Sequence, residues 1–272
     1  MSNIQYINFD SLNGSTYNTS NQNNSYTFNI SYASLSPNAF NATFQLQNPL
    51  HNISKIHLKS IELPIGWNNV RASSKLNIIG VAASCDLSGN YSNVFSISLA
   101  DKTYTSVSTL IADINSSFLA LYPTINIIFS LVNGYISVSS TSSIFTTKLY
   151  VVPTNLAYVL GFRKLLDVQT TGLTTASCVY NLNVDNYINL YISNISSTHS
   201  NNANGVLCHF KIITNAVNGV VYYASENNSY SQSINVNYWI PINNLCVSIT
   251  DRFGYSINSC GLDYSFTLGF SS

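Results

Sequence analysis

Hydrophobic and polar residues alternate with a period of two along most of the chain. Such runs occupy residues 26–30, 44–46, 56–58, 95–99, 188–192, 208–212, 234–240, 245–249 and 264–270. This alternation places one side of a strand on a core and the other towards water. Roughly eight or more strands with turn residues between them are typical of a β-sandwich or jelly roll. Neither half of the chain completes a sandwich alone, so we expect strands from both ends to pair.

The alternation changes phase inside one of these runs. Ile56 and Leu58 carry the apolar side first, and Ile61 and Leu63 carry it afterwards. One extra residue in a strand produces such a shift, so we predict a bulge or a strand switch near Ser60.

One segment has the periodicity of a helix instead. Thr105 or Ser106 can cap its start and Pro123 ends it. Its apolar residues recur at steps of three and four, at Val107, Leu110, Ile111, Ile114, Phe118 and Leu121. Alternating residues follow on both sides of Asn133-Gly134, the dipeptide most typical of a tight hairpin. Helix and hairpin together predict a small α+β lobe at residues 100–167, inserted into a jelly-roll domain formed by residues 25–99 and 168–272.

The start of the chain has a different composition. Residues 11–25 are nearly all Ser, Asn, Thr and Gly, which cannot bury enough apolar area to order themselves. We therefore expect residues 1–24 to form a flexible N-terminal arm, which a neighbouring subunit could order.

Charge is scarce throughout. Charged residues make up 7 % of the chain, against roughly a quarter in an average soluble protein, while 46 % of the residues are hydrophobic. An uncharged polar surface loses little hydration free energy when a partner covers it, which favours assembly with other subunits. Drift in the composition of the source genome would explain the Asn and Ile excess equally well.

Two classes of partner are disfavoured. The net charge is zero and the longest basic cluster is Arg163-Lys164, whereas binding to nucleic acid requires clustered cations. No apolar run approaches the length of about 18 residues that a membrane span needs.

Candidate catalytic groups are isolated. Cys208-His209 is the one Cys-His pair, and neighbours on a strand point to opposite faces, so Cys208 is interpreted as a core residue. His51, His57, His199 and His209 have no metal-ligand spacing. We expect Asp251 to close a turn through backbone amides rather than to form an acid pair with Asp263. Arg252 beside it would cover apolar surface or meet a partner's acid. The sequence therefore predicts no enzyme, no catalytic or metal residues and no cofactor.

The cysteines number five and have no short spacing. No secretory signal pattern is apparent at the N-terminus, so we expect free thiols in a reducing compartment. The 19 tyrosines leave a sugar-binding role open, since sugars stack on aromatic rings.

Three stretches resemble a known family: Phe44-Gln45-Leu46 with residues 53–64; Tyr104, Leu110 and Ile114-Asn115 with Leu160-Gly161-Phe162; and residues 245–251 with Gly254 and residues 261–268. From about residue 25 to 270 the chain is similar to the penton or minor capsid proteins of large icosahedral DNA viruses and virophages. That resemblance implies a single jelly roll that forms vertex pentamers beside trimeric double-jelly-roll capsomers. It also implies an outward-pointing insertion, here residues 100–167, and no catalytic residues.

The expected function is thus a structural virion protein, a penton subunit that assembles as a homopentamer. Its expected partners are copies of itself, the capsomers of the major capsid protein and other minor capsid proteins, and its expected location is the capsid of a virion made in the host cytoplasm. A minor capsid protein, or a trimeric fibre or lectin-like receptor-binding module, is the alternative.

Overall fold

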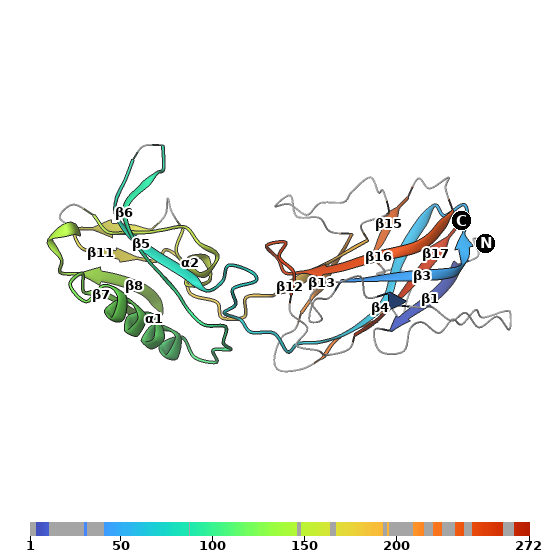
Figure 1. The fold of residues 1–272 in the computed structure, drawn as a ribbon, viewed down its shortest axis with the longest axis horizontal. Helices are drawn as coiled ribbons and strands as arrows, with labels where there is room; N and C mark the ends of the chain where they lie inside the picture. Colours follow the sequence, from blue (N-terminus) through green and yellow to red (C-terminus); the bar gives the residue numbers. More distant parts are fainter. Residues whose placement is uncertain are drawn as a thin grey trace. The chain divides into compact units, whose positions relative to one another are not determined.

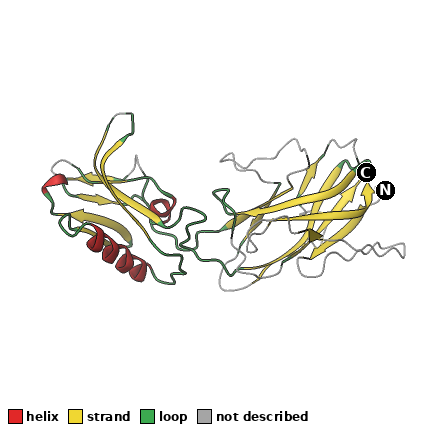
Figure 2. Ribbon diagram, in the orientation of Figure 1, coloured by secondary structure: helices red, strands yellow, loops and turns green. Residues whose placement is uncertain are grey.

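The structure is a computed structural model in which residues 4–10, 30–31, 41–86, 88–145, 148–163, 167–192, 195, 209–214, 220–224, 232–236, 241–257 and 264–272 are described. The chain forms two compact units (Figures 1 and 2). The first unit is made of Met1–Trp67 and Asp185–Ser272, and the second, the lobe, is Asn68–Val184.

Two antiparallel sheets form the first unit. One sheet has the order β1 (Ile4–Asp10), β17 (Ser265–Ser271), β4 (Lys55–Pro64) and β14 (Val220–Ala224), and β15 (Ser233–Asn235) also pairs with β4. The other has the order β13 (Phe210–Ile213), β12 (Tyr187–Ile192), β16 (Ile242–Thr250), β3 (Asn41–Leu50) and β2 (Ile30–Ser31).

The strand pairing in this unit is nested. The first strand pairs with the last, β1 with β17, and inside that pair lie β3 with β16, β4 with β14 and β12 with β13. A long antiparallel hairpin folded over into two sheets produces this order, which is that of a jelly roll. The predicted all-β jelly-roll class, with an inserted α+β lobe, is confirmed.

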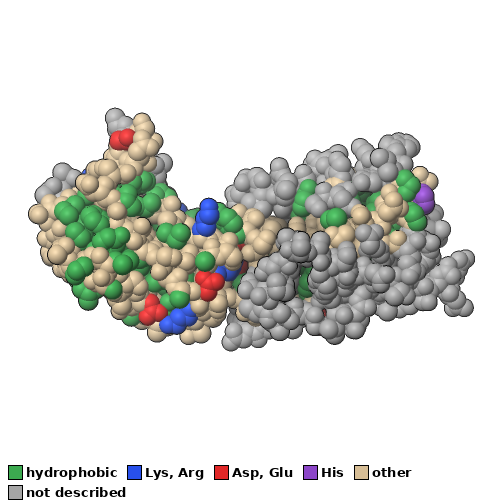
Figure 3. All heavy atoms as spheres, in the orientation of Figure 1, with side chains coloured by type: hydrophobic (Ala, Val, Ile, Leu, Met, Phe, Trp, Pro, Cys, Tyr) green, Lys and Arg blue, Asp and Glu red, His purple; other side chains and the backbone are tan. Residues whose placement is uncertain are grey.

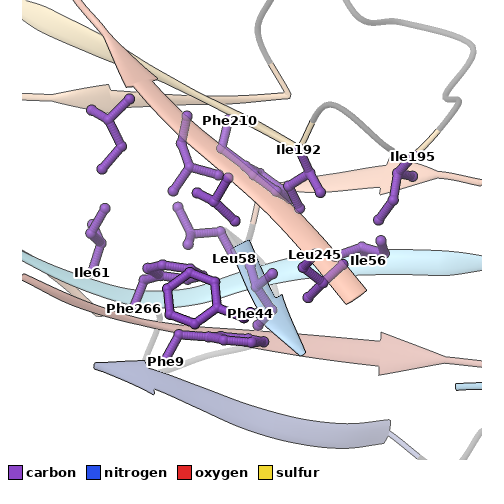
Figure 4. Close-up of a cluster of buried hydrophobic side chains, with 14 of the residues drawn as sticks. Phe9, Phe44, Ile56, Leu58, Ile61, Ile192, Ile195, Phe210, Leu245 and Phe266 are labelled. Atoms are coloured by element: carbon purple, nitrogen blue, oxygen red, sulfur yellow. The ribbon is translucent and has the colours of Figure 1, made fainter. Parts of the chain in front are cut away.

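Both sheets contribute the inward side chains of one core (Figure 4). Phe9 of β1 stacks on Phe266 of β17 with ring centroids 4.8 Å apart, and Phe44 of β3 meets both rings edge-on at 4.9 and 5.5 Å. All three rings are buried. The alternation predicts this arrangement, because in β16 Leu245, Val247 and Ile249 are buried while the residues between them are not.

The predicted bulge near Ser60 is confirmed. Thr267 lies opposite Ser60, but the next residue, Leu268, lies opposite Leu58, so Lys59 is the extra residue in β4. Because of this insertion Ile56, Leu58, Ile61 and Leu63 are all buried on the same side.

The predicted N-terminal arm is wrong for its first part. Residues 4–10 form β1, and seven register pairs join this strand to β17. Ile7 and Phe9 alternate with polar residues and are buried in the jelly-roll core, so this segment does order itself. Residues 11–24, the Ser- and Asn-rich part of the expected arm, lie outside the described residues.

The described residues of the lobe form two small sheets and two α-helices. One sheet is β6 (Tyr91–Ser98), β5 (Ile78–Cys85) and β9 (Tyr150–Val151), and the other is β10 (Val168–Thr170), β11 (Leu173–Thr175), β8 (Tyr135–Ser140) and β7 (Ile127–Val132). The helices are α1 (Val107–Leu121) and α2 (Asn155–Val159), with a 3₁₀ turn at Ser143–Phe145.

The predicted helix and hairpin are confirmed. Ser106 caps α1, because its side chain accepts a hydrogen bond from the backbone N–H of Ser108. Asn133 and Gly134 have φ values of 51° and 83°, the positive values that a two-residue hairpin requires. The predicted apolar side of the helix is buried except for Leu121, which is exposed at the C-terminal end.

The lobe is wider than residues 100–167. Residues 68–99 and 168–184 belong to it, because β5 pairs with β6 and β9, and β11 pairs with β8. Phe95 of β6 also packs against Tyr122 and Phe145, at centroid distances of 5.4 and 6.0 Å. Alternation shows which side of a strand is buried but not which sheet the strand joins. For this reason the sequence-based prediction wrongly placed these strands in the jelly roll.

The residues that directly precede and follow the lobe are in contact within the first unit. The indole N–H of Trp67 donates a 2.8 Å hydrogen bond to a carboxylate oxygen of Asp185, and both residues are buried. The backbone carbonyl of Asp185 accepts a hydrogen bond from the Thr214 hydroxyl. Hydrogen bonds within the jelly roll therefore join the two chain segments that lead into and out of the lobe.

Phe266→Ala is expected to lower the free energy of unfolding by about 3–5 kcal/mol, because the truncation leaves a cavity between Phe9 and Phe44. Chemical denaturation measures this loss. The control is Leu119→Ala on α1, whose side chain is 64 % exposed and whose loss should cost less than about 0.5 kcal/mol. Equal effects of the two substitutions would contradict the central position of β17.

Replacing residues 68–184 by a short Gly-Ser linker is expected to leave a folded jelly roll, because Trp67 and Asp185 already lie in contact and loop closure depends weakly on length. Circular dichroism and cooperative thermal unfolding of the shortened chain measure the outcome. The matched control is the same deletion carrying Phe266→Ala, which should lose cooperative unfolding. An insoluble or unfolded shortened chain without that substitution would show that the lobe is part of the jelly-roll core.

Candidate functional site

Asp251 closes the turn between β16 and the following segment. One of its carboxylate oxygens accepts hydrogen bonds from the backbone N–H groups of Phe253 and Tyr255, at 2.8 and 3.0 Å. Gly254 has a φ of 87°, the left-handed conformation that glycine adopts at low cost. The predicted turn role of Asp251 is confirmed, while Asp263, its candidate acid partner, lies outside the described residues.

Cations near this turn lie over aromatic rings. The Lys211 ammonium is 4.0 Å from the centroid of Tyr187, and the Arg252 guanidinium is 5.4 Å from that of Phe253 and 5.8 Å from that of Tyr187. Arg252 thus covers apolar surface, as one of the two sequence interpretations proposed. Arg163, half of the longest basic cluster, lies 3.6 Å over the ring of Tyr158.

His209 is buried beside the first residue of β13. Its Nδ1 accepts a hydrogen bond from the backbone N–H of Ile192 at 3.1 Å, and its ring lies 4.6 Å from that of Tyr191. Burial lowers the pKa of His209 to about 4, so the ring is neutral at pH 7. With Nδ1 as acceptor, the proton of the neutral ring is on Nε2. Cys208, the neighbour in the sequence, lies outside the described residues.

The remaining candidates do not converge. His57 lies on β4, where its Nε2 is 3.0 Å from the Ser271 hydroxyl, and His51 is exposed before that strand. Burial, with the nearby Lys55 charge, lowers the pKa of His57. His199 lies outside the described residues, and within those residues no three His, Cys, Asp or Glu side chains are grouped to hold a metal.

Cys85, Cys178 and Cys246 form no disulfide among the described residues, and Cys208 and Cys260 lie outside those residues. In the described part of the chain, no helix combines the length and the apolar character that crossing a membrane requires.

Exposed apolar side chains are the main surface feature that the sequence analysis missed. Among the described side chains, the large hydrophobic residues that are exposed all lie in the lobe, apart from Ile213. Figure 3 shows such side chains at several places on the lobe surface in that view. A signal was present in residues 127–132, where apolar residues occupy both sides of the predicted strand.

Four of these residues share one side of the sheet formed by β7, β8 and β11. Val132 pairs with Tyr135, and Ile128 and Leu173 both lie opposite Ser139. These four apolar residues therefore lie on one face, the outer face of the lobe sheet. Their exposed fractions are between 39 % and 49 %. The hydroxyl groups of Ser137 and Thr175, 3.0 Å apart, separate these apolar residues. An uncharged face of this kind is suited to burial against another protein.

The comparisons with known proteins find matches among solved structures. No protein-family model matches the chain, and no curated protein matches it. Among solved structures, the chain is similar to the crystal structure of the penton protein of mavirus, with 12 % sequence identity and a TM-score of 0.38. This match covers 98 % of the chain and 100 % of the mavirus protein. A TM-score of this size does not establish a shared fold, and the jelly-roll assignment follows from the strand pairing alone.

Acid is expected to destabilise the protein through His209. The unfolded state has the ordinary pKa of about 6.5 and binds the proton first, so stability is complete above pH 6.5 and falls between pH 6.5 and about 4. The loss across this window is on the order of 3 kcal/mol. Urea unfolding as a function of pH measures it.

The matched variants separate this effect from that of other groups. His209→Phe keeps a ring but cannot titrate, so its profile should be flatter between pH 6.5 and 4. His51→Gln, at an exposed histidine, controls for the effect of replacing a histidine as such. A His209→Phe profile parallel to that of the parent protein would show that His209 is not the group that titrates.

Proposed function

We propose that this chain is a structural capsid protein of an icosahedral virus, and that it forms the fivefold vertices as a homopentameric penton. The nested strand pairing of β1 with β17, β3 with β16, β4 with β14 and β12 with β13 is the observation that carries the proposal. Jelly rolls of this order are the building unit of many viral capsids, and they also occur in lectins.

The surface chemistry supports a structural role. Asp251 is used in a turn, His209 in a backbone hydrogen bond and Lys211 over an aromatic ring, and the described exposed apolar residues, apart from Ile213, lie on the lobe. A chain with 7 % charged residues and an uncharged, partly apolar lobe gains free energy when neighbouring subunits cover it. We therefore propose a non-enzymatic role.

The partners that fit this role are further copies of the chain, capsomers of the major capsid protein and other minor capsid proteins. The protein would then be located in the virion, in a capsid made in the host cytoplasm. A lobe inserted between β4 and β12, which follow each other along the chain of the first unit, can carry additional contacts without altering the jelly-roll interfaces.

The purified protein is expected to form a closed ring of about 150 kDa, five times the 29.9 kDa of one chain. A head-to-tail interface that closes under rotation produces such a ring. Native mass spectrometry measures the mass, and electron cryo-microscopy of the particle locates the protein. A trimer in solution would instead indicate a fibre, and location away from the fivefold axes would indicate a different minor capsid role.

Residues 1–24 are unsuitable for testing this assembly by truncation. Their removal deletes β1 and with it Phe9 from the core, so a lost oligomer could reflect unfolding. Tyr135→Lys places a charge on the outer face of the lobe sheet without touching the jelly-roll core. Unchanged pentamer mass in this variant would assign the ring contacts to the jelly roll, and a shift to monomer would assign them to the lobe.

A further inference from the structure

The edge strand β7 has a sequence prone to self-association. It reads Ile-Ile-Phe-Ser-Leu-Val, without charge, proline or glycine, and it lies at the end of its sheet in the order β10-β11-β8-β7. Six-residue segments of this composition form cross-β ladders when an edge is open to another chain. Edge strands are commonly protected by lysine, proline or a bulge, and β7 contains neither lysine nor proline.

A side-chain amide occupies the outward edge of β7 at its centre. The Asn115 amide on α1 donates a 2.9 Å hydrogen bond to the carbonyl of Phe129 and accepts a 2.7 Å bond from the N–H of the same residue. Both backbone groups of Phe129 therefore point away from β8, and the amide of Asn115 satisfies them as a neighbouring strand would. Figure 1 shows α1 lying along β7 and β8.

The same arrangement occurs at a second edge strand, in the other unit. β13 is at the end of its sheet, and the N–H of its Lys211 donates a 2.8 Å bond to the side-chain oxygen of Gln232. The nitrogen of that side chain in turn donates to the carbonyl of Lys211. At a third edge, the Tyr122 hydroxyl donates a 3.0 Å bond to the carbonyl of Ser96 in β6. Side chains close strand edges repeatedly in this protein, so the Asn115 contact is one case of a general device.

We propose that the outer edge of β7 is a latent strand-addition surface that the Asn115 amide keeps closed, and that the strand it fits is the β7 of a second copy of this chain. A second β7 strand is also uncharged, so no charge repulsion opposes the pairing. In a stack of identical strands, each apolar residue packs against the same residue of the next copy. Ile128 and Val132, exposed on the outer face, then supply the apolar surface that two stacked ladders bury. This association is separate from the capsid role and competes with it.

Asn115→Ala removes both bonds to Phe129 and opens the edge. The lag time of aggregation at neutral pH and 37 °C is expected to shorten by at least about tenfold, the change in open population that the net loss of even one of these two hydrogen bonds permits. Light scattering and thioflavin T fluorescence measure it. Ser116→Ala, at the next and exposed helix position, is the matched control and should aggregate like the parent protein. An unchanged lag time for Asn115→Ala would overturn the proposal.

A second variant separates edge opening from simple loss of stability. Ile128→Lys adds a charge to the solvent side of β7 and restores no hydrogen bond to Phe129. In the Asn115→Ala background it should return the lag time to that of the parent protein without raising the thermal midpoint. If the double variant aggregates as fast as Asn115→Ala, general unfolding is responsible and the proposal fails.

The edge of β13 supplies an internal comparison. Gln232→Ala removes the corresponding bonds to Lys211, but Lys211 itself carries a charge that discourages pairing. Its effect on the lag time should therefore be smaller than that of Asn115→Ala. Hydrogen exchange of the aggregates should show protection of residues 127–132, and protection confined to other segments would count against β7 as the strand that pairs.

Discussion

The pairing of the first strand with the last is the constraint on which the rest of the jelly roll depends. The ring of Phe9 near one end of the chain stacks on that of Phe266 near the other, and Phe44 from the facing sheet packs against both. Between β1 and β17 the strands pair as successively shorter nested hairpins, with β3 on β16 and β4 on β14. Pairing of β17 with β4 and of β16 with β12 joins these hairpins into the two sheets. The contacts that close the fold are therefore the most distant in the sequence, so their loop-closure entropy is the largest among the strand pairs of this unit.

The nested order also explains where a lobe can be inserted. Its innermost pair is β12 with β13, and the chain reaches β12 from β4 through the connection that holds Asn68–Val184. The hydrogen bond between Trp67 and Asp185 fixes the two ends of that connection to the jelly roll. The lobe has a separate set of buried residues, with Phe118 of α1 stacked on Phe129 of β7. Each unit thus has its own buried core, and the pairing of the jelly-roll strands does not depend on the sequence of the lobe.

The sequence pattern predicted well which side chains of a strand point into the core, but it predicted poorly which strands pair with each other. The alternation identified the core positions of β16 and β17 and predicted a bulge near Ser60, next to the extra residue Lys59, because the side of a strand on which a residue lies is a local property with a period of two. It missed β1, whose Ile7 and Phe9 are adjacent to a polar stretch that dominates the local composition. It also assigned β5 and β6 to the jelly roll, because pairing partners depend on contacts far along the chain. The role of Asn115 had no sequence signal, since an amide within a helix is ordinary and only the tertiary structure places it against Phe129.

The scarcity of charge connects the proposed role with the way in which the edges are closed. A surface with few ions is favourable for subunits that must be covered by neighbours, but it removes the lysines with which most β-proteins protect edge strands. Asn and Gln can donate and accept at once, so one carboxamide satisfies both outward groups of an edge residue without adding charge. The amides of Asn115 and Gln232 therefore protect an edge at no cost to an uncharged interface, because no ion must be desolvated when subunits meet. A chain selected for assembly through specific surfaces has a physical reason to close its other edges in this way.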